Sequence, residues 1–422
     1  MNIPESSAPR VVIVGGGFGG LQLAKHLPGN MFQIVLIDKH NYHAFQPLLY
    51  QVATAGLEPD SIAYPIRKIF AKKKNFYFRV AEVLGVNPDK KCISASIGDL
   101  EYDYLVLATG TVTNFFGNEH IQRFAMSMKT VPEALDIRSL ILQNFEKALL
   151  TDDLKIRASL MNFVIVGGGP TGVELAGAIS ELKNHVLPND YPDLDLRRMQ
   201  IHLIEGQDRL LPPMSEQSSK KAQEYLEKMG VIVWLGTQVK DYDGRIITTS
   251  GKPMDTQTLI WAAGVHCMPP KGLPADSLVK GNRIKVDVHN KAEGFDGLYA
   301  IGDLAYMETE KFPKGHPQVA QPAIQQGKNL AKNFVRMRSG KALKPYRYRD
   351  LGYLATIGRT RAVADLPGFK TQGALAWFIW MFVHLLALVG FRNKVVVFFN
   401  WTYNFFNYDR DIRLIIRPFR KD

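Results

Sequence analysis

At 422 residues the chain is too long for one ordinary hydrophobic core, so two or three domains are expected. An apolar fraction of 46% and a charged fraction of 22% are typical of a globular protein and argue against a disordered one. The net charge of +12 indicates attraction to an anionic surface, but no helix-turn-helix, RNP or zinc-finger pattern accompanies it, so nucleic acid is not a predicted partner.

The first predicted elements are a strand, a glycine-rich turn, a helix and a second strand. Residues 10–14 are a β-branched run, typical of a strand buried on both faces. A helix is predicted over 21–27 and a strand over 32–37, which ends at Asp38, an acid that can accept hydrogen bonds from an adenosine ribose. The turn carries the G-x-G-x-x-G fingerprint with Gly15, Gly17 and Gly20. This order predicts a dinucleotide site at the N-terminus of the helix.

Two further segments are predicted to surround this site. Residues 40–70 contain prolines and several aromatic residues, which favours a loop over a regular element. We expect the loop to line a cofactor ring, and the alternative is an apolar loop that covers the edge of the sheet. The stretch 104–111 is predicted to be another buried strand that ends in a turn of small residues. These residues leave room for a ligand against the backbone, and they are Ala108, Thr109 and Gly110.

The opening pattern then recurs after a helix predicted over 132–150. A strand at 162–166 leads into a second fingerprint, followed by a helix over 173–183 and a strand over 199–204 that ends at Glu205. The stretch 185–198 is interpreted as an inserted loop, because Glu205 lies farther from the fingerprint than usual. The glycines of this second fingerprint are Gly167, Gly169 and Gly172.

Two dinucleotide sites in one chain predict a flavoprotein in which one site holds FAD and the other holds NAD(H). The charge of Glu205 would repel a 2′-phosphate and therefore favours NAD(H) over NADP(H). A strand ending in Gly302 and Asp303 places an acid where it can bind the ribityl chain of a flavin, whereas the alternative is a turn aspartate that caps a helix.

These features resemble the two-dinucleotide-domain flavoprotein oxidoreductases. Within that group the stretches 45–53, 167–176 and 320–327 are similar to those of the type II NADH:quinone oxidoreductases, and the likeness covers nearly the whole chain. The resemblance implies non-covalently bound FAD, NADH as donor and a membrane quinone, ubiquinone or menaquinone, as acceptor, without ion pumping. It also implies a homodimer.

The expected fold class is α/β, with two Rossmann-like domains arranged as in glutathione reductase and a C-terminal amphipathic membrane-associating region. The resemblance implies that the NAD domain is inserted between two segments of the FAD domain. We expect the FAD domain to comprise 1–120 and 285–360, the NAD domain 121–284, and the membrane-association region 361–422.

The resemblance also assigns cofactor contacts residue by residue. The expected FAD contacts are Gly15, Gly17, Phe18, Gly19, Gly20, Asp38, Lys39, Pro47, Ala108, Thr109, Gly110, Gly302, Asp303, Ala320 and Gln321. The expected NAD contacts are Gly167, Gly169, Pro170, Thr171, Gly172, Glu174, Glu205, Ala263 and Gly264. No metal site is predicted.

Three residues are candidates for catalysis. Glu174 follows the second fingerprint, where a buried carboxylate with a raised pKa would relay a proton to the quinone, and the alternative is a first-turn acid favoured by the helix dipole. Gln321 and Gln325 fall on one helix face, where their amides would donate to the flavin and to a quinone carbonyl. The alternative is a buried helix start that satisfies its own backbone. His43, His316 and Lys394 are left unassigned.

The carboxyl end is aromatic and basic. Residues 377–390 carry no formal charge but are shorter than the roughly 20 residues of a membrane-spanning helix. From residue 361 onward there are nine basic and four acidic residues, the last cations being Arg410, Arg413, Arg417, Arg420 and Lys421. This pattern predicts a helix pair in the lipid headgroup region, with cations on lipid phosphates. The alternative is a dimer interface or a cap over the FAD domain.

Other relatives fit less well. Sulfide:quinone oxidoreductases and disulfide reductases need redox cysteines, whereas Cys92 and Cys267 are two cysteines far apart. A soluble NAD(P)H-dependent flavin or ferredoxin-type reductase is the alternative function, since it explains both fingerprints but not the carboxyl end. A redox-sensing membrane adaptor would keep the folds without turnover. The amino end shows no signal or transit peptide, so we expect the cytoplasmic face of a bacterial inner membrane.

Overall fold

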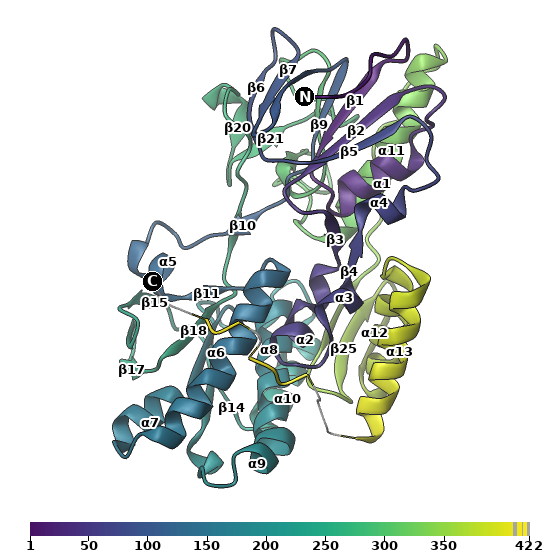
Figure 1. Ribbon diagram of the computed structural model, residues 1–422. Coiled ribbons are helices and arrows are strands. Elements are labelled where there is room, and N and C mark those ends of the chain that lie inside the picture. The colour runs from purple at the N-terminus through teal and green to yellow at the C-terminus, as the bar shows by residue number, and fades with distance from the viewer. Residues whose placement is uncertain (408–411, 416, 420–422) are drawn as a thin grey trace. The chain divides into compact units, whose positions relative to one another are not determined.

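The computed structural model describes residues 1–407, 412–415 and 417–419 (Figure 1). Its chain forms two compact units, each assembled from three segments. Unit 1 comprises Met1–His43, Tyr64–Val112 and Val265–Asp350, and unit 2 comprises Ala44–Ala63, Thr113–Gly264 and Leu351–Asp422. Each unit is built on a five-stranded parallel sheet, which confirms the predicted α/β class. The predicted domain boundaries stay a prediction.

The sheet of unit 1 has the strand order β22-β9-β1-β2-β5. Its central strand is the predicted β-branched run, which is buried and pairs with β2 on one side and β9 on the other. The strands are β1 (Arg10–Val14), β2 (Gln33–Asp38), β5 (Phe76–Val80), β9 (Tyr104–Leu107) and β22 (Leu298–Ala300). All five carboxyl ends therefore lie at one edge of the sheet, where ligands bind in folds of this type.

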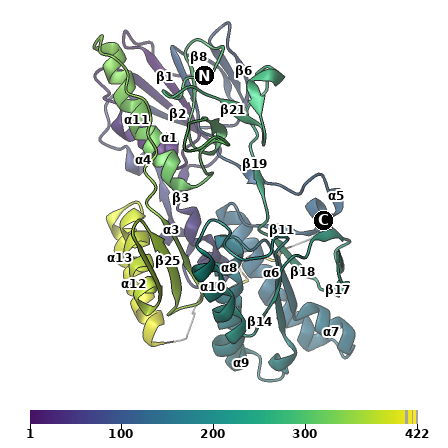
Figure 2. The same cartoon turned by 180° about the vertical axis from the view of Figure 1, so that it is seen from behind.

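Two long helices of unit 1 pack side by side (Figures 1 and 2). These are α1 (Phe18–His26) and α11 (Ala320–Arg338). They approach so closely that a Cβ on Gly327 would lie 2.4 Å from the Gly19 carbonyl oxygen, so a glycine is required there. The remaining elements are α4 (Ile66–Ile69), β6 (Val83–Asn87), β7 (Cys92–Ala95), β8 (Gly98–Glu101), η4 (Ala275–Ser277), β20 (Leu278–Val279), β21 (Arg283–Lys285), η5 (Gly302–Leu304) and β23 (Ala305–Tyr306).

The sheet of unit 2 repeats this design with the order β11-β18-β12-β13-β14. Its strands are β11 (Met126–Ser127), β12 (Asn162–Val166), β13 (Gln200–Ile204), β14 (Val231–Trp234) and β18 (Thr258–Trp261). Its helices include the predicted crossing helix, and they are α5 (Glu119–Phe124), α6 (Val131–Leu150), α7 (Leu154–Leu160), α8 (Pro170–Glu181) and α10 (Glu216–Lys228). A small antiparallel sheet is formed by β15 (Val239–Tyr242), β16 (Ile246–Thr249) and β17 (Met254–Asp255).

The end of the chain adds a second antiparallel sheet and two helices to unit 2. They are β24 (Tyr353–Thr356), β25 (Ala362–Leu366), β26 (Phe369–Gly373), α12 (Ala374–Ala387) and α13 (Phe391–Phe406). The predicted helix pair is therefore present, and its two helices run side by side (Figure 2). Within the described residues, no helix has the length and apolar character needed to cross a membrane.

Short elements lie at the borders of the units and inside two segments predicted as loops. The border elements are β3 (Tyr42–Ala44), β4 (Ala63–Pro65), β10 (Val112–Thr113) and β19 (Val265–His266). The prediction of a loop over 40–70 is wrong in part, because the segment contains three short helices. They are η1 (Gln46–Leu48), α2 (Leu49–Ala53) and α3 (Pro59–Ile62). The loop predicted over 185–198 is also partly helical, with η2 (Leu182–Val186), α9 (Leu187–Asp190) and η3 (Leu196–Arg198). In both segments proline occupies a first-turn position, where it starts a helix instead of breaking one.

Candidate functional site

The first fingerprint forms a tight turn between β1 and α1. Gly15 has a φ of +107°, and a Cβ on Gly20 would lie 1.9 Å from the Gly15 carbonyl oxygen, so both positions require glycine. A Cβ on Gly17 would meet nothing within 4 Å, which leaves open space in front of the turn. No side chain caps α1, and no acidic residue stands in its first turn. The N-terminus of α1 therefore presents its positive dipole end to that space, as an anion site does.

Asp38 holds the middle of this turn. One carboxylate oxygen accepts a hydrogen bond from the Gly16 N–H at 2.5 Å, and the other accepts one from the His40 N–H at 2.7 Å. The His40 ring nitrogen Nδ1 also lies 3.6 Å from the second oxygen. The oxygen that accepts from Gly16 keeps a second lone pair, so the carboxylate can still accept from a ribose hydroxyl. The neighbouring Lys39, also an expected FAD contact, pairs instead with Glu82 at 2.6 Å on the surface.

Further predicted FAD contacts lie at the ends of β9 and β22. Ala108 backs onto the glycine turn, because a Cβ on Gly15 would lie 2.3 Å from its carbonyl oxygen. The turn at Gly302 is held by the side chain of Gln326, whose amide oxygen accepts its N–H at 2.6 Å. Asp303 accepts a hydrogen bond from the Thr111 hydroxyl at 3.2 Å. Gln326 and Thr111 were not predicted as site residues, although Gln326 lies within the stretch 320–327 and Thr111 directly follows Gly110.

The two predicted glutamines at the start of α11 have partners within unit 1. Gln321 accepts a hydrogen bond from the Tyr348 hydroxyl at 3.2 Å. Gln325 donates to the Arg349 carbonyl at 2.8 Å and accepts from the Arg349 N–H at 3.0 Å. The Gln325 amide is thus fixed to backbone, and its predicted contact with a quinone stays a prediction. Ala320 is the first residue of this helix.

The second fingerprint has the same geometry in unit 2. Gly167 has a φ of +113°, a Cβ on Gly172 would lie 1.9 Å from the Gly167 carbonyl oxygen, and a Cβ on Gly169 would meet nothing within 4 Å. Pro170 starts α8, which has no side-chain cap, and Thr171 follows it at an exposed position. Two Rossmann turns with open space at the second glycine of the fingerprint, Gly17 and Gly169, fit two pyrophosphate groups.

Glu205 mirrors Asp38. Its carboxylate accepts the Gly168 N–H at 2.6 Å and the Gln207 N–H at 2.8 Å. The predicted contacts Ala263 and Gly264 follow β18, and the ring of exposed Phe116 packs so closely on Gly264 that an added Cβ would lie 2.6 Å from it. Phe116 was not predicted, and no sequence motif indicated it.

Glu174 lies one turn into α8 and is buried. Burial raises the pKa of its carboxyl to about 8, while the Thr356 N–H, 3.4 Å from Oε1, and the nearby Trp380 indole act in the opposite direction. Trp380 does not reach hydrogen-bond geometry, since its Nε1 has no partner among the described residues. The carboxyl is therefore mainly protonated at neutral pH and is able to donate a proton.

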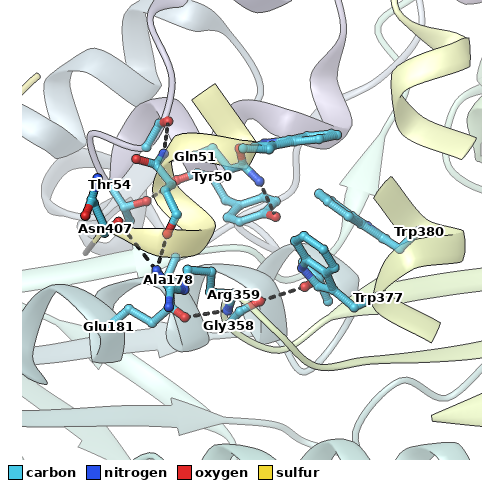
Figure 3. A pocket seen from close by; sticks show the side chains of 14 residues that line it. Tyr50, Gln51, Thr54, Ala178, Glu181, Gly358, Arg359, Trp377, Trp380 and Asn407 are labelled. Atoms are coloured by element: carbon cyan, nitrogen blue, oxygen red, sulfur yellow. Dashed lines mark hydrogen bonds between the residues drawn. The ribbon is translucent and has the colours of Figure 1, made fainter. Parts of the chain in front are cut away.

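Beside Glu174, unit 2 contains an open pocket, whose empty space together with the solvent at its mouth is about 620 Å³ (Figure 3). Its walls include Thr356 and Trp380, both of which adjoin Glu174. Trp380 lies 5.1 Å from the ring of Trp401 between centroids, and Figure 3 shows Trp377 and Trp380 side by side. Three tryptophans thus give the pocket flat apolar walls that suit an aromatic ring.

Polar groups line the opposite side of this pocket. The Trp401 indole N–H donates to the Gln51 side chain at 2.8 Å, and the Gln51 amide donates to the Tyr50 hydroxyl at 2.8 Å. Arg359 lines the pocket too, and its backbone N–H donates to Glu181 of α8. Tyr50 and Gln51 fall in the stretch 45–53 that carried the family resemblance. The expected FAD contact Pro47 belongs to the same segment, in η1 of unit 2.

Helices α12 and α13 expose large apolar side chains. Leu375, Phe378, Phe382, Val383, Leu386, Phe391, Phe398, Phe399 and Tyr403 are each at least 42% exposed. Of the predicted basic residues, Arg413 pairs with Asp190 at 2.6 Å and Arg417 with Asp136 at 2.7 Å, so these two engage carboxylates of the chain. Arg410, Arg420 and Lys421 lie outside the described residues. Lys394 donates to the Leu386 carbonyl at the end of α12.

Comparisons with known proteins agree with this geometry. Residues 9–327 match the family model for pyridine nucleotide-disulphide oxidoreductases, and residues 351–411 match the one for the NDH2 C-terminal domain. The chain is 35% identical to the type II NADH:quinone oxidoreductases Ndh and NdhA of Mycobacterium tuberculosis, over 95% and 94% of this chain and 90% and 87% of theirs. The fold is shared with NDH2 of Plasmodium falciparum, solved in complex with NADH, at a TM-score of 0.89 and 22% identity over 97% of this chain and 100% of that one.

Proposed function

Because the chain belongs to the type II NADH:quinone oxidoreductases, within the pyridine nucleotide-disulphide oxidoreductase family, we propose that it oxidises NADH through bound FAD and reduces a membrane quinone without pumping protons. The observation that carries the proposal is the pair of glycine fingerprints. Each is followed by a helix without a side-chain cap, and in each a strand-terminal acid accepts the N–H of the central glycine, Gly16 or Gly168. The isoalloxazine of FAD, when bound, supplies the acceptance of hydride and the onward transfer of electrons.

The residues of unit 1 fit FAD. Gly15, Gly17 and the N-terminus of α1 would hold the pyrophosphate, because open space at Gly17 is what close approach of a phosphate requires. Asp38 would bind the adenosine ribose with its remaining lone pairs, and Asp303 the ribityl chain. The other expected contacts, from Gly19 and Lys39 to Ala320 and Gln321, remain part of the proposal.

The residues of unit 2 fit NADH in the same way. Gly167, Gly169 and the N-terminus of α8 would hold its pyrophosphate, and Glu205 its adenosine ribose. Because two backbone N–H groups fix the carboxylate of Glu205, its charge stands in the way of a 2′-phosphate. The proposed donor is therefore NADH in preference to NADPH.

Glu174 and the pocket beside it suit the quinone. The tryptophan side chains would line the quinone ring, and the buried Trp380 Nε1–H beside Glu174 would donate to a quinone carbonyl. Reduction of a quinone takes up two protons, and Glu174 is held protonated at neutral pH by its burial. We therefore assign Glu174 the role of proton donor at this pocket.

The exposed apolar side chains of α12 and α13 suit a membrane surface, which is where a quinone resides. They are large, they recur at helical spacing, and no described helix is built to span a bilayer. The net charge of +12 favours anionic headgroups. The proposed location is the cytoplasmic face of a bacterial inner membrane, and the proposed assembly is a homodimer.

Anaerobic stopped-flow tests the function. Mixing the purified protein with NADH should bleach bound flavin, and mixing the reduced protein with a short-chain quinone should restore its colour. A protein that stays colourless after FAD is supplied would refute the proposal. Flavin that is bleached by NADH but regains its colour only with a ferredoxin or free flavin would favour the soluble reductase instead.

A further inference from the structure

The first glycine turn is held by a side chain that the second turn lacks. In both turns the middle glycine, Gly16 or Gly168, gives its N–H to the strand-terminal acid. The carbonyl of Gly168 accepts a backbone hydrogen bond from the Leu211 N–H at 2.8 Å. The carbonyl of Gly16 lies 2.9 Å from Nδ1 of His43 instead. One imidazole thus replaces a backbone group in an otherwise repeated design.

The surroundings of His43 settle which nitrogen carries the proton. The side chain is 2% exposed, and burial lowers its pKa, so the ring is neutral and carries one N–H. A carbonyl oxygen can only accept, so that N–H is on Nδ1 and donates to Gly16. The rings of Phe18 and His43 meet at 84° with their centroids 5.2 Å apart, and this packing restrains the plane of the imidazole.

The remaining nitrogen of His43 is also informative. Nε2 is buried and has no hydrogen-bond partner among the described residues. A neutral imidazole with its proton on Nδ1 presents Nε2 as an acceptor, and buried acceptors in native proteins are nearly always satisfied. Because the chain itself covers Nε2, the link between His43 and the glycine turn runs through Nδ1.

We propose that His43 is a positioning residue of the FAD site, which fixes the Gly16–Gly17 peptide through its Nδ1–H and so sets the glycine turn for the pyrophosphate. This proposal rests on the proposed function, because it needs FAD in unit 1. Asp38 holds the N–H of the Gly15–Gly16 peptide and His43 holds the carbonyl of the Gly16–Gly17 peptide, so both peptide planes that flank Gly16 are fixed. The turn is therefore shaped before the cofactor arrives, which lowers the entropy cost of binding.

The experiment measures the affinity of the full-length protein for FAD. The holoprotein is diluted, and released FAD is followed by its fluorescence. His43→Leu, which removes the donor at similar volume, should raise the Kd for FAD about tenfold, close to the worth of one hydrogen bond. His43→Asn carries an N–H on the atom that matches Nδ1, so it should stay within about threefold of the wild type. NADH binding to unit 2 should not change in either variant.

The matched control is His202→Leu. His202 is a buried histidine in β13 of unit 2 that accepts from the Trp234 indole and contacts neither glycine turn, so this variant should keep the wild-type affinity for FAD. If His43→Leu does not fold, His43→Gln replaces it. The amide N–H of glutamine stands one bond farther from Cα than Nδ1 of histidine, so His43→Gln should also raise the Kd for FAD about tenfold.

Three results would overturn the role of His43: wild-type affinity in the donor-less variant, no rescue by asparagine, or an equal loss in the His202 control. A wild-type protein that binds no FAD would instead refute the proposed function, so the two failures are distinguishable.

Discussion

Replacing Glu174 with glutamine should stabilise unit 2, and the gain should grow as the pH rises. The folded chain keeps this carboxyl buried and protonated up to a pKa of about 8, whereas its ordinary value is 4.5. In the unfolded chain the same group ionises freely above pH 4.5. Between these two pH values the folded state therefore holds a proton that the unfolded state has released. Glutamine resembles the protonated acid in shape and cannot ionise in either state.

The sign and size follow from linkage. Where the folded state binds more protons than the unfolded state, the free energy of unfolding falls as the pH rises. The wild type thus has its full stability below pH 4.5 and loses it progressively until the pH passes about 8. The loss amounts to about 3 kcal/mol at pH 7 and reaches about 5 kcal/mol above pH 8, at 1.4 kcal/mol per pKa unit. Any constant effect of the amide itself cancels when the comparison is made across pH.

Denaturant unfolding followed by tryptophan fluorescence is the assay. All five tryptophans of the chain lie in unit 2, so their signal reports on that unit alone. Wild type and Glu174→Gln are compared at several pH values between 4.5 and 9, and the difference should widen up to pH 8 and then level off. Glu216→Gln, at an exposed position of α10, is the control whose difference should not follow this curve. A constant difference between wild type and Glu174→Gln at every pH would show that Glu174 is not held protonated by burial.

Four further outcomes are expected. Glu174→Gln should slow the reoxidation of reduced flavin by quinone. The reoxidation rate of the wild type should fall as the pH rises through about 8, whereas the rate of the variant should not. An equal pH profile in both proteins would contradict the role of Glu174 as a proton donor. Gly17→Ala should fold and lose affinity for FAD, and Gly169→Ala should do the same for NADH, whereas Gly20→Ala should prevent folding of unit 1; circular dichroism and binding titrations separate these cases. Gln51→Ala should raise the KM for quinone by breaking the link to Trp401 while leaving reduction by NADH near normal, which steady-state and stopped-flow kinetics would show or refute. The double variant Phe382→Glu/Phe399→Glu should bind anionic vesicles about tenfold more weakly, or weaker still. The control Phe369→Glu, at an exposed position of β26, should bind as the wild type does. Equal sedimentation of the wild type and both variants with vesicles would argue against the proposed membrane surface.

The repeated fingerprint could be predicted from sequence because its causes are local. Glycines at 15, 17 and 20 act through backbone sterics, and a β-branched run makes a buried strand almost wherever it occurs. Both strands and both helices accordingly lie within a few residues of their predicted bounds. The family resemblance was confirmed for the same reason, since its motifs are those that the fold itself requires.

The pocket could not be predicted, because its walls come from segments far apart in the chain. Trp380 and Trp401 stand on α12 and α13, Gln51 on α2, and Thr356 on β24. Only the folded chain brings them together, so the sequence indicated Glu174 as an acid near a helix start without the burial that raises its pKa. The partners of the basic residues near the C-terminus could not be predicted either. Its composition predicted lipid contacts, and the spatial partner of Arg413 proved to be Asp190.

The hydrogen bonds of Glu205 show how the proposed preference for NADH over NADPH would be enforced. A glutamate that merely stood near the ribose could rotate away to admit a 2′-phosphate, and its charge would then discriminate little. Glu205 cannot do so without giving up its hydrogen bonds to Gly168 and Gln207, and those bonds also shape the turn that receives the pyrophosphate. Binding of NADPH would therefore require either repulsion between Glu205 and the 2′-phosphate or loss of the hydrogen bonds that shape the turn. Glu205→Gln removes the charge but keeps an acceptor for Gly168, so it should lose discrimination against NADPH while retaining most of its affinity for NADH, and a variant that still rejected NADPH would place the selectivity elsewhere.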